Sequence, residues 1–418
     1  MSTILDLHIH SRYSRACSPQ LTLENIDATC RVKGVDIISC GDFTFPGWYR
    51  SLREELEETF PGSGLYRHKS ASDNKVNFLI GTEVSLVYKD EGKARRIHLV
   101  VHAPNLSSAG ELNRQLDKNF NIRSDGRPIL GLSAPDFVKL VLAVNPEFLV
   151  YPAHIWTPWY SVFGSKSGFD SLEACFKDQV EHIYAYETGL SSDPQMNWRV
   201  SALDKLTLLS SSDAHSLANI AREATIMDLT EVPSYEQIYK NIRFHQNIAG
   251  TIEFYPEEGM YHIDGHRDCN FSCLPEESRR RQGICPVCKK PLVIGVLSRV
   301  EDLSDNPVGH KPSCARDFKK IVELDKIIAD AIKVKSRSSK AVQIEYKRWI
   351  DLFGSELNIL LNLDLSLAVG QNIDQRVIEG IRRVRLGKLG ITPGFDGQYG
   401  HISIFTDKDY PIQQTSLL

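Results

Sequence analysis

Two histidines spaced two residues apart close the first apolar run of the chain. The run Ile4–Ile9 has the composition of a β-strand, and side chains alternate along a strand. His8 and His10 would therefore lie on one face, where two imidazoles can bind a metal ion. Taken alone, the short pattern is better explained by a surface strand that carries two histidines by chance, so the rest of the sequence has to decide.

Six further short apolar runs follow within the first 215 residues, and all of them carry metal-ligand types. The runs are Asp36–Cys40, Asn77–Gly81, Ile97–His102, Phe148–Ala153, Ile183–Tyr186 and Leu206–Ser211. The residues at or after their ends are Asp42, Glu83, His98 with His102, His154, Glu187, and Asp213 with His215. Each alone could be a core histidine, a turn residue or a helix cap, but the set of seven predicts a metal centre.

Helical patterns separate several of these runs. One of them, Leu21–Lys33, follows the start signal Ser18-Pro19. Strand alternating with helix predicts a parallel α/β fold, and seven repeats favour a β/α barrel, in which the ends of the strands meet on one face. Seven or eight ligands exceed the needs of one ion, so we expect two or three divalent cations. Mixed ligands favour Zn, Mn or Fe over Mg, and such clusters commonly hydrolyse phosphoesters.

The loop after His154 is expected to lie over this centre. It contains Trp156 and Trp159, which could stack on a base, and Lys166 in a Gly/Ser stretch that could bind a phosphate. Packing of the two tryptophans against the barrel rim is an equal alternative. We expect Glu187, in the next loop, to hydrogen-bond to a metal ligand rather than to bind an ion itself.

The motifs of residues 1–250 resemble those of the PHP (polymerase and histidinol phosphatase) superfamily. They are Asp6-Leu7-His8-Ile9-His10-Ser11, Gly41-Asp42, Gly81-Thr82-Glu83, Tyr151-Pro152-Ala153-His154 and Ser212-Asp213-Ala214-His215-Ser216. The resemblance implies a distorted seven-stranded barrel with a trinuclear metal centre. The ligands that it implies are His8, His10, Glu83, His98, His154, Asp213 and His215, with Asp42 at the acidic position of the second motif.

Within this set we expect Glu83, Asp213 and His215 to be the catalytic residues. The sequence departs from the pattern at Phe45, because close relatives have histidine at this position. Phenylalanine cannot bind a metal, so one of the three sites is expected to be incomplete or weaker.

Four cysteines after residue 250 predict a second, structural metal site. Cys269 and Cys273 form C-x3-C, and Cys285 and Cys288 form C-P-x-C. Two such knuckles can place four thiolates around one zinc ion, as in a zinc ribbon. His262 or His266, just upstream, could replace one cysteine. Between the knuckles, Arg279 and Arg280 could contact phosphates, although a solvated loop is an equal explanation.

The remaining residues read as a basic helical segment. Helices are predicted over Cys314–Ile332, Ala341–Leu361 and Asp374–Val384. Residues 266–418 hold 24 Lys and Arg against 19 Asp and Glu, whereas residues 1–265 are net acidic. This imbalance weakly favours a polyanionic partner. The expected division is a barrel at 1–250, a zinc ribbon at 251–312 and a helical domain at 313–418.

This three-part layout resembles the endonuclease Q family over the whole chain. The resemblance implies a DNA repair nuclease that cuts on the 5′ side of deaminated bases (hypoxanthine, uracil, xanthine) or abasic sites in lesion-containing, double-stranded DNA. Two alternatives remain: a small-molecule phosphoesterase of the histidinol-phosphatase type, and a non-catalytic DNA-binding scaffold. Neither a membrane span nor a signal peptide is evident, so we expect a cytoplasmic protein. A recruiting clamp or helicase cannot be named from the sequence.

Overall fold

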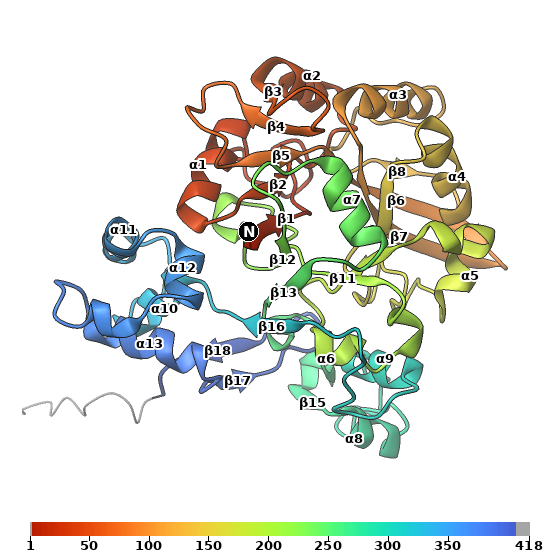
Figure 1. Cartoon of the computed structure of the whole chain (residues 1–418). Coiled ribbons are helices and arrows are strands. Elements are labelled where there is room, and N and C mark those ends of the chain that lie inside the picture. The colour runs from red at the N-terminus through yellow and green to blue at the C-terminus, as the bar shows by residue number, and fades with distance from the viewer. Residues whose placement is uncertain (1, 407–418) are drawn as a thin grey trace, which may run out of the picture.

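The computed structural model describes residues 2–406 (Figure 1). A strand overlaps each of the seven predicted runs, and these strands surround a buried apolar interior. They are β1 (Ser2–Asp6), β2 (Ile37–Ser39), β5 (Asn77–Leu79), β7 (Lys93–His102), β9 (Leu149–Pro152), β10 (Ala185–Glu187) and β11 (Thr207–Leu209).

Helices occupy most of the predicted connections. They are α1 (Leu23–Lys33), α2 (Pro46–Glu55), α3 (Leu106–Asp117), α4 (Ala134–Val144), α5 (Leu172–Phe176), α6 (Pro194–Asn197) and α7 (Tyr235–Arg243). The two ends of α1 illustrate how start and stop residues in the sequence define a helix. The Thr22 side chain accepts a hydrogen bond from the Asn25 amide at its start, and Gly34 ends it in the left-handed conformation.

The barrel prediction required parallel strands throughout, but the strands are not all parallel. Within the described residues, their hydrogen-bonded ladders also do not run continuously around a barrel. β1, β2 and β5 are parallel neighbours in an eight-stranded sheet, and β10 pairs in parallel with β11. A separate sheet has the order β8 (Ile129–Leu130), β6 (Gly81–Asp90), β7, β9. Residues Ile9 and Ala214 form a bridge beyond the ends of β1 and β11.

The exception to parallel pairing is β7. It is antiparallel to both β6 and β9, because β6 and β7 form one long hairpin that turns at Glu91-Gly92. Both turn residues have positive φ, as tight hairpin turns require. β7 thus runs against the other strands, so its middle, not its end, reaches the face where the other strands deliver their polar residues.

The eight-stranded sheet extends beyond the predicted barrel. Its order is β16 (Asp317–Lys320), β13 (Ile248–Glu253), β12 (Ala224–Asp228), β1, β2, β5, β4 (Leu65–His68), β3 (Leu56–Glu58). The predicted helix over Cys314–Ile332 was wrong in its first half. Residues 317–320 pair with the open edge of β13 instead, and α10 (Leu324–Ala331) begins only afterwards.

Residues 264–303 form a small metal-site module, and a helical cluster follows α10. The module contains β14 (Asp264–His266), β15 (Phe271–Cys273), α8 (Pro275–Arg280) and α9 (Val296–Leu303). The cluster contains α11 (Lys340–Phe353), α12 (Glu356–Leu361), α13 (Gln375–Arg385), β17 (Gly390–Thr392) and β18 (His401–Ser403). Within residues 2–406, we find no helix with the length and apolarity needed to span a membrane.

Candidate active site

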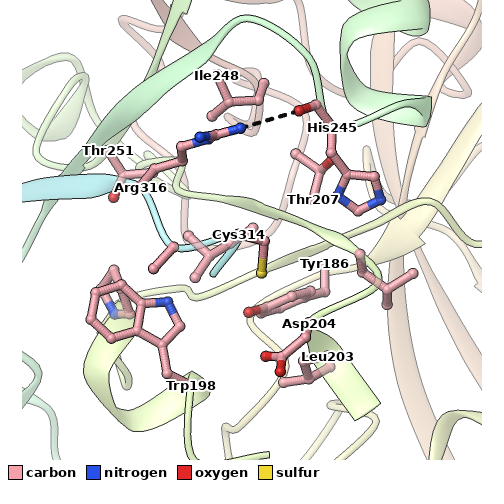
Figure 2. Close-up of a pocket in the computed structure, with 14 residues that line it drawn as sticks. Tyr186, Trp198, Leu203, Asp204, Thr207, His245, Ile248, Thr251, Cys314 and Arg316 are labelled. Atoms are coloured by element: carbon pink, nitrogen blue, oxygen red, sulfur yellow. Dashed lines mark hydrogen bonds between the residues drawn. The ribbon is translucent and has the colours of Figure 1, made fainter. Parts of the chain in front are cut away.

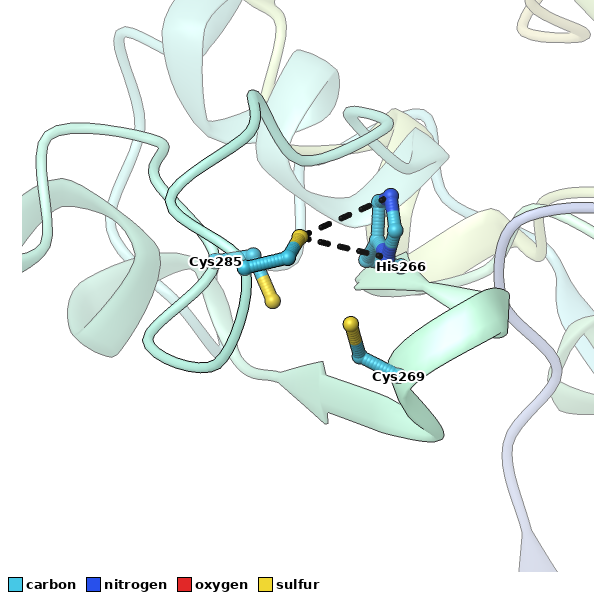
Figure 3. A group of neighbouring side chains, drawn as sticks. His266, Cys269 and Cys285 are labelled. Carbon is cyan, nitrogen blue, oxygen red and sulfur yellow. Dashed lines mark hydrogen bonds between the residues drawn. The ribbon is translucent and has the colours of Figure 1, made fainter.

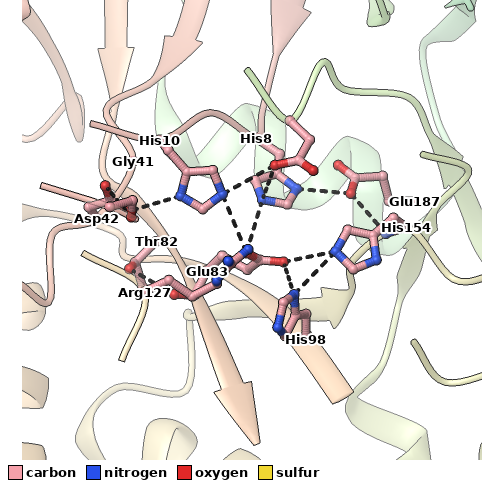
Figure 4. Close-up of polar contacts among 12 residues, drawn as sticks. His8, His10, Gly41, Asp42, Thr82, Glu83, His98, Arg127, His154 and Glu187 are labelled. Atoms are coloured by element: carbon pink, nitrogen blue, oxygen red, sulfur yellow. Dashed lines mark hydrogen bonds and ion pairs between the residues drawn. The ribbon is translucent and has the colours of Figure 1, made fainter. Parts of the chain in front are cut away.

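Polar residues that lie in or directly after the predicted runs converge in one buried cluster (Figure 4). His8, His10 and Asp213 form one group of ligand atoms that all lie within 4.8 Å of one another. A second such group consists of Glu83, His98 and His154. These six residues belong to the predicted ligand set, and the fold brings all of them together.

Glu83 links the two groups. Its Oε1 lies 2.8 Å from His98 Nδ1 and 3.0 Å from His154 Nε2, while its Oε2 lies 3.4 Å from His10 Nε2. One carboxylate therefore faces both triads, which is the geometry of a bridging ligand.

The donor set fits divalent cations. The Nε2 atoms of His8 and His10 and the Oδ1 atom of Asp213 are buried and make no hydrogen bond. His10 Nε2 nevertheless lies 3.2 Å from Asp213 Oδ1. Buried polar atoms are rarely left without a partner, so these three atoms indicate a site for an ion.

Further side chains hold the imidazole rings in place. Glu187 Oε2 is 2.9 Å from His8 Nδ1 and also accepts a hydrogen bond from the His154 amide. Asp42 Oδ1 is 3.0 Å from His10 Nδ1, and the Ser161 hydroxyl is 3.0 Å from His154 Nδ1. Each ring is thus fixed through one nitrogen while the other faces the cluster, as in many metal sites.

The charges of the cluster favour cations. Burial disfavours the imidazolium form of His8, but the carboxylates of Glu187 and Glu83 outweigh it and raise the pKa of His8 well above its usual range. Burial would raise the pKa of Asp213, but His10 and other neighbouring histidines hold it well below its usual range. Burial lowers the pKa of His98 to about 4, so His98 is neutral and free to act as a ligand.

Two predicted histidines lie outside the two triads. His215 lies at the rim: its ring centroid is 4.6 Å from that of His10 and its Nδ1 is 3.6 Å from Asp213 Oδ1. His102 lies elsewhere, with Nε2 3.0 Å from the Tyr151 hydroxyl. The reversed direction of β7 explains this, because only the middle of the strand, at His98, reaches the cluster.

Asp42 and Phe45 offer little to a third ion. Both oxygens of Asp42 are engaged: Oδ2 accepts from the amide and hydroxyl of Ser11 and from the Ser14 hydroxyl, and Oδ1 faces His10. Phe45 stacks on Tyr13 at 4.5 Å between ring centroids. Asp42 thus orients a ligand rather than presenting a free oxygen.

Arg127 belongs to the cluster, although no sequence pattern pointed to it. Its Nη1 donates to Glu83 Oε2 at 2.9 Å, and its side chain is 25% exposed. Arg127 lies in a loop before β8, outside every apolar run, so neither periodicity nor ligand type pointed to it. A basic residue in a loop carries no signal of its own.

A third metal-ligand group, outside the active-site cluster, consists of three cysteines and one histidine (Figure 3). His266, Cys269, Cys285 and Cys288 bring their ligand atoms within 4.8 Å of one another. Cys273, predicted as the fourth ligand, lies outside this group. In the β14–β15 hairpin it pairs with Asp264, at the opposite end from His266 and the turn that carries Cys269. The three-cysteine, one-histidine set suits a structural zinc ion.

Comparison with known sequences gives two curated relatives, both uncharacterized. Residues 323–388 match the family model described as the MJ0043 C-terminal domain. The protein MJ0043 of Methanocaldococcus jannaschii is 33% identical over 259 residues, which are 60% of this chain but only 32% of that protein. YqxK of Bacillus subtilis is 25% identical over 95% of this chain and 98% of its own length.

Two solved structures match the fold from end to end. One is the lesion-specific endonuclease PfuEndoQ from Pyrococcus furiosus, with a TM-score of 0.85, 28% identity, and coverage of 99% of this chain and 98% of that one. In structure, the chain is similar to endonuclease Q from end to end. The other is endonuclease Q in complex with a 27-mer duplex that has an abasic lesion at the active site, with the same TM-score and identity and full coverage of both chains.

The predicted substrate-binding residues of the loop after His154 lie in different environments. Trp156 is fully buried and donates its indole N–H to Asn197 at 2.7 Å, so it is a core residue. Trp159 is 36% exposed and meets Tyr261 edge to face, with 5.4 Å between ring centroids. Lys166 lines a groove together with the basic residues Lys93, Arg95, Lys177 and Arg299 and the acidic residues Asp90, Glu91 and Asp170.

The two arginines between the knuckles differ in their partners. Arg279 forms ion pairs with Glu301 at 3.2 Å and with Asp302 at 3.0 Å. Arg280 has only a 3.9 Å contact with Glu276, and its side chain is 71% exposed. Of the two, Arg280 is the one better placed to contact a phosphate.

Figure 2 shows a separate pocket that is lined by residues outside the two triads. Tyr186 lines this pocket, whereas its neighbour Glu187 contacts His8. Trp198, Asp204, His245 and Cys314 also line it. None of the residues of the two triads reaches it, so it is distinct from the candidate active site.

Proposed function

We propose that this protein is a metal-dependent DNA repair endonuclease that hydrolyses a phosphodiester on the 5′ side of deaminated bases (hypoxanthine, uracil, xanthine) or abasic sites. The observation that carries the proposal is the buried cluster of His8, His10, Glu83, His98, His154 and Asp213 in a chain that shares the fold of endonuclease Q throughout. Endonuclease Q itself has been solved with an abasic lesion of a duplex at its active site, which supports a damaged duplex as the substrate here.

The two triads would hold two divalent cations of the Zn, Mn, Fe or Mg class, with Glu83 able to contact both. When bound, such a pair of ions makes a water molecule nucleophilic and neutralises phosphodiester oxygens. Asp42, Glu187 and Ser161 fix the ligand rings, so the site needs little rearrangement to accept its ions. His215, at the more exposed rim, would contact the phosphate or the leaving oxygen.

The rest of the chain would hold the duplex. We propose a division into a catalytic barrel at 1–250, a zinc-binding segment at 251–312 and a helical segment at 313–418. The exposed Trp159–Tyr261 pair offers an aromatic surface for an unstacked base. Lys166, in its partly basic groove, and Arg280 offer charges for backbone phosphates.

The test is cleavage of end-labelled duplexes that contain hypoxanthine, uracil, xanthine, an abasic site or no lesion, with Mn²⁺ or Mg²⁺. We expect a single nick on the 5′ side of the lesion, no nick in undamaged DNA, and no activity in the Asp213→Ala variant. The Asp228→Ala variant is a matched control, because Asp228 is an exposed residue at the end of β12.

Three other outcomes would each point to a different function. Nicking of all duplexes regardless of lesion would indicate a general nuclease. Hydrolysis of a small phosphomonoester without DNA cleavage would indicate a phosphoesterase. DNA binding without hydrolysis, in protein whose barrel is loaded with metal, would indicate a scaffold.

A further inference from the structure

Arg127 is held in the active-site cluster by an anchored loop. The Gly126 amide donates to the Tyr13 carbonyl at 3.0 Å, and the Gly126 carbonyl accepts from the Thr44 hydroxyl at 3.2 Å. On the other side, the Pro128 carbonyl accepts from the Ser85 amide at 3.0 Å. Hydrogen bonds thus fix the backbone directly before and directly after Arg127. They constrain the position from which its side chain extends toward the cluster.

Gly126 allows the loop that carries Arg127 to lie close to Asp42 and Ser14. A Cβ atom added at Gly126 would lie 2.4 Å from both Asp42 Oδ2 and the Ser14 hydroxyl oxygen. Only glycine lets the loop pack this closely against the carboxylate that orients His10. The loop therefore belongs to the construction of the active site.

A third divalent ion lacks ligands on this side of the cluster. Asp42 has both oxygens engaged, and Phe45 has an apolar side chain stacked on Tyr13. In the described residues of the barrel, metal-ligand groups form two triads and no third. The trinuclear centre implied by the PHP resemblance therefore does not fit this chain.

We infer that Arg127 supplies the third positive charge of this centre: the barrel binds two divalent ions, and the Arg127 guanidinium takes the role of a third cation by binding an oxygen of the substrate phosphate. This deepens the proposed function and rests on it for the identity of the phosphodiester. Arginine suits the role because its charge is permanent and its planar fork pairs with two phosphate oxygens. One N–H is engaged with Glu83, and the partial exposure leaves room for a ligand at the others.

The first test counts metal ions in the full-length protein by mass spectrometry after loading with excess Zn²⁺ or Mn²⁺ and dialysis. A Cys285→Ser variant identifies the ion held by the cysteine module. We expect two ions in the barrel of the wild type and of Arg127→Met. Three ions in the wild-type barrel would overturn the inference.

The second test measures binding of inorganic phosphate to the metal-loaded protein by calorimetry. Loss of a charge-assisted pair predicts that Arg127→Met weakens binding by about tenfold or more, and that Arg127→Lys recovers part of the loss. Arg123→Met is the matched control. It removes a charge from the same loop, where Arg123 is exposed and paired with Asp117, and should leave phosphate affinity unchanged.

Equal phosphate affinity in the wild type and Arg127→Met would refute the inference, as would an equal loss in Arg123→Met. Neither measurement uses DNA. If the counts and affinities behave as expected but no lesion is cleaved, the role of Arg127 stands and the proposed repair function fails.

Discussion

Trp156 and Trp159 lie three residues apart in the sequence and in opposite environments in the structure. Trp156 is fully buried against Phe163, and Trp159 reaches the surface beside Tyr261. The sequence left stacking on a base and packing at the rim equally open for both. Alternation of aromatic and polar residues in a loop does not reveal which ring turns inward, because a loop has no fixed period.

This contrast predicts opposite effects of two substitutions. Trp156→Ala should lower the free energy of unfolding by about 3–5 kcal/mol, since it empties a core position. Trp159→Ala should change it by less than about 1 kcal/mol, yet weaken binding to lesion-containing duplex. Denaturant titration and fluorescence anisotropy measure the two quantities. Unchanged DNA affinity in Trp159→Ala would remove this residue from the substrate surface.

Glu187 permits a second prediction at the same scale. Because it orients His8 and contacts the His154 amide, Glu187→Gln should weaken barrel metal binding by about tenfold or more while the chain stays folded. Competition with a chelator reports the affinity. Glu181→Gln, an exposed carboxylate on a nearby segment, should leave metal affinity as it is. A similar loss in both variants would speak against an orienting role.

At the scale of elements, the β14–β15 hairpin determines which cysteines can share a metal. We expect Cys269→Ser to lose the structural zinc ion, and Cys273→Ser to retain it, because Cys269 and not Cys273 belongs to the ligand group with His266. Zinc content after dialysis separates the two. Retention of zinc by Cys269→Ser would show that Cys273 completes the site.

The start of α10 contains a pH-sensitive ion-pair network. Glu323 is 2% exposed and lies 3.1 Å from Arg337 Nη1 and 3.0 Å from Lys326 Nζ. Burial alone would raise the pKa of Glu323, but these cations outweigh it and lower the pKa to about 2. The stabilisation is therefore complete above the ordinary carboxyl pKa and disappears as the pH falls from about 5 to about 2.

This network predicts that the wild type loses about 3 kcal/mol more than Glu323→Gln as the pH falls through that window. Unfolding free energies measured at several pH values provide the difference. Glu276→Gln serves as control, since Glu276 is exposed and its contact with Arg280 is long. Parallel pH profiles for the wild type and Glu323→Gln would contradict the assignment.

The sequence patterns predicted where the strands lie, but they did not predict the direction of every strand. Each of the seven apolar runs overlaps a strand, because short apolar segments that are rich in β-forming residues and bounded by turn residues usually form strands. The direction of β7 was missed, since β6 and β7 form a hairpin within what looked like a single β/α repeat. Residue type led to the six side chains that form the two triads, but Arg127 was missed because its position in the cluster depends on where one loop packs.

At the scale of the whole molecule, the predicted barrel and the predicted helical part are joined by side-chain contacts and by a shared sheet. Lys33 in α1 and Glu356 in α12 form an ion pair of 2.8 Å between side chains exposed by only 6% and 2%. Arg337 donates to the Ala218 carbonyl, and β16 extends the sheet that begins with the barrel strands. The helical cluster is therefore part of the fold that positions the active site.

We accordingly predict that a chain ending at residue 312 melts about 5 °C or more below the full chain, even in the presence of metal. Loss of activity after removal of residues 313–418 would therefore not by itself show that these residues bind the substrate. Calorimetry of both lengths decides the point. Equal melting temperatures would show that the barrel is stable without residues 313–418.

The late pairing of β16 with β13 also has a consequence for synthesis of the chain. β13 leaves the ribosome well before β16, and the entire metal-site module is made in between. Throughout that interval the β13 edge presents unpaired amides and carbonyls, which can pair with another nascent chain. Pairing of β16 thus also covers the edge of β13, at which aggregation of the newly made chain would begin.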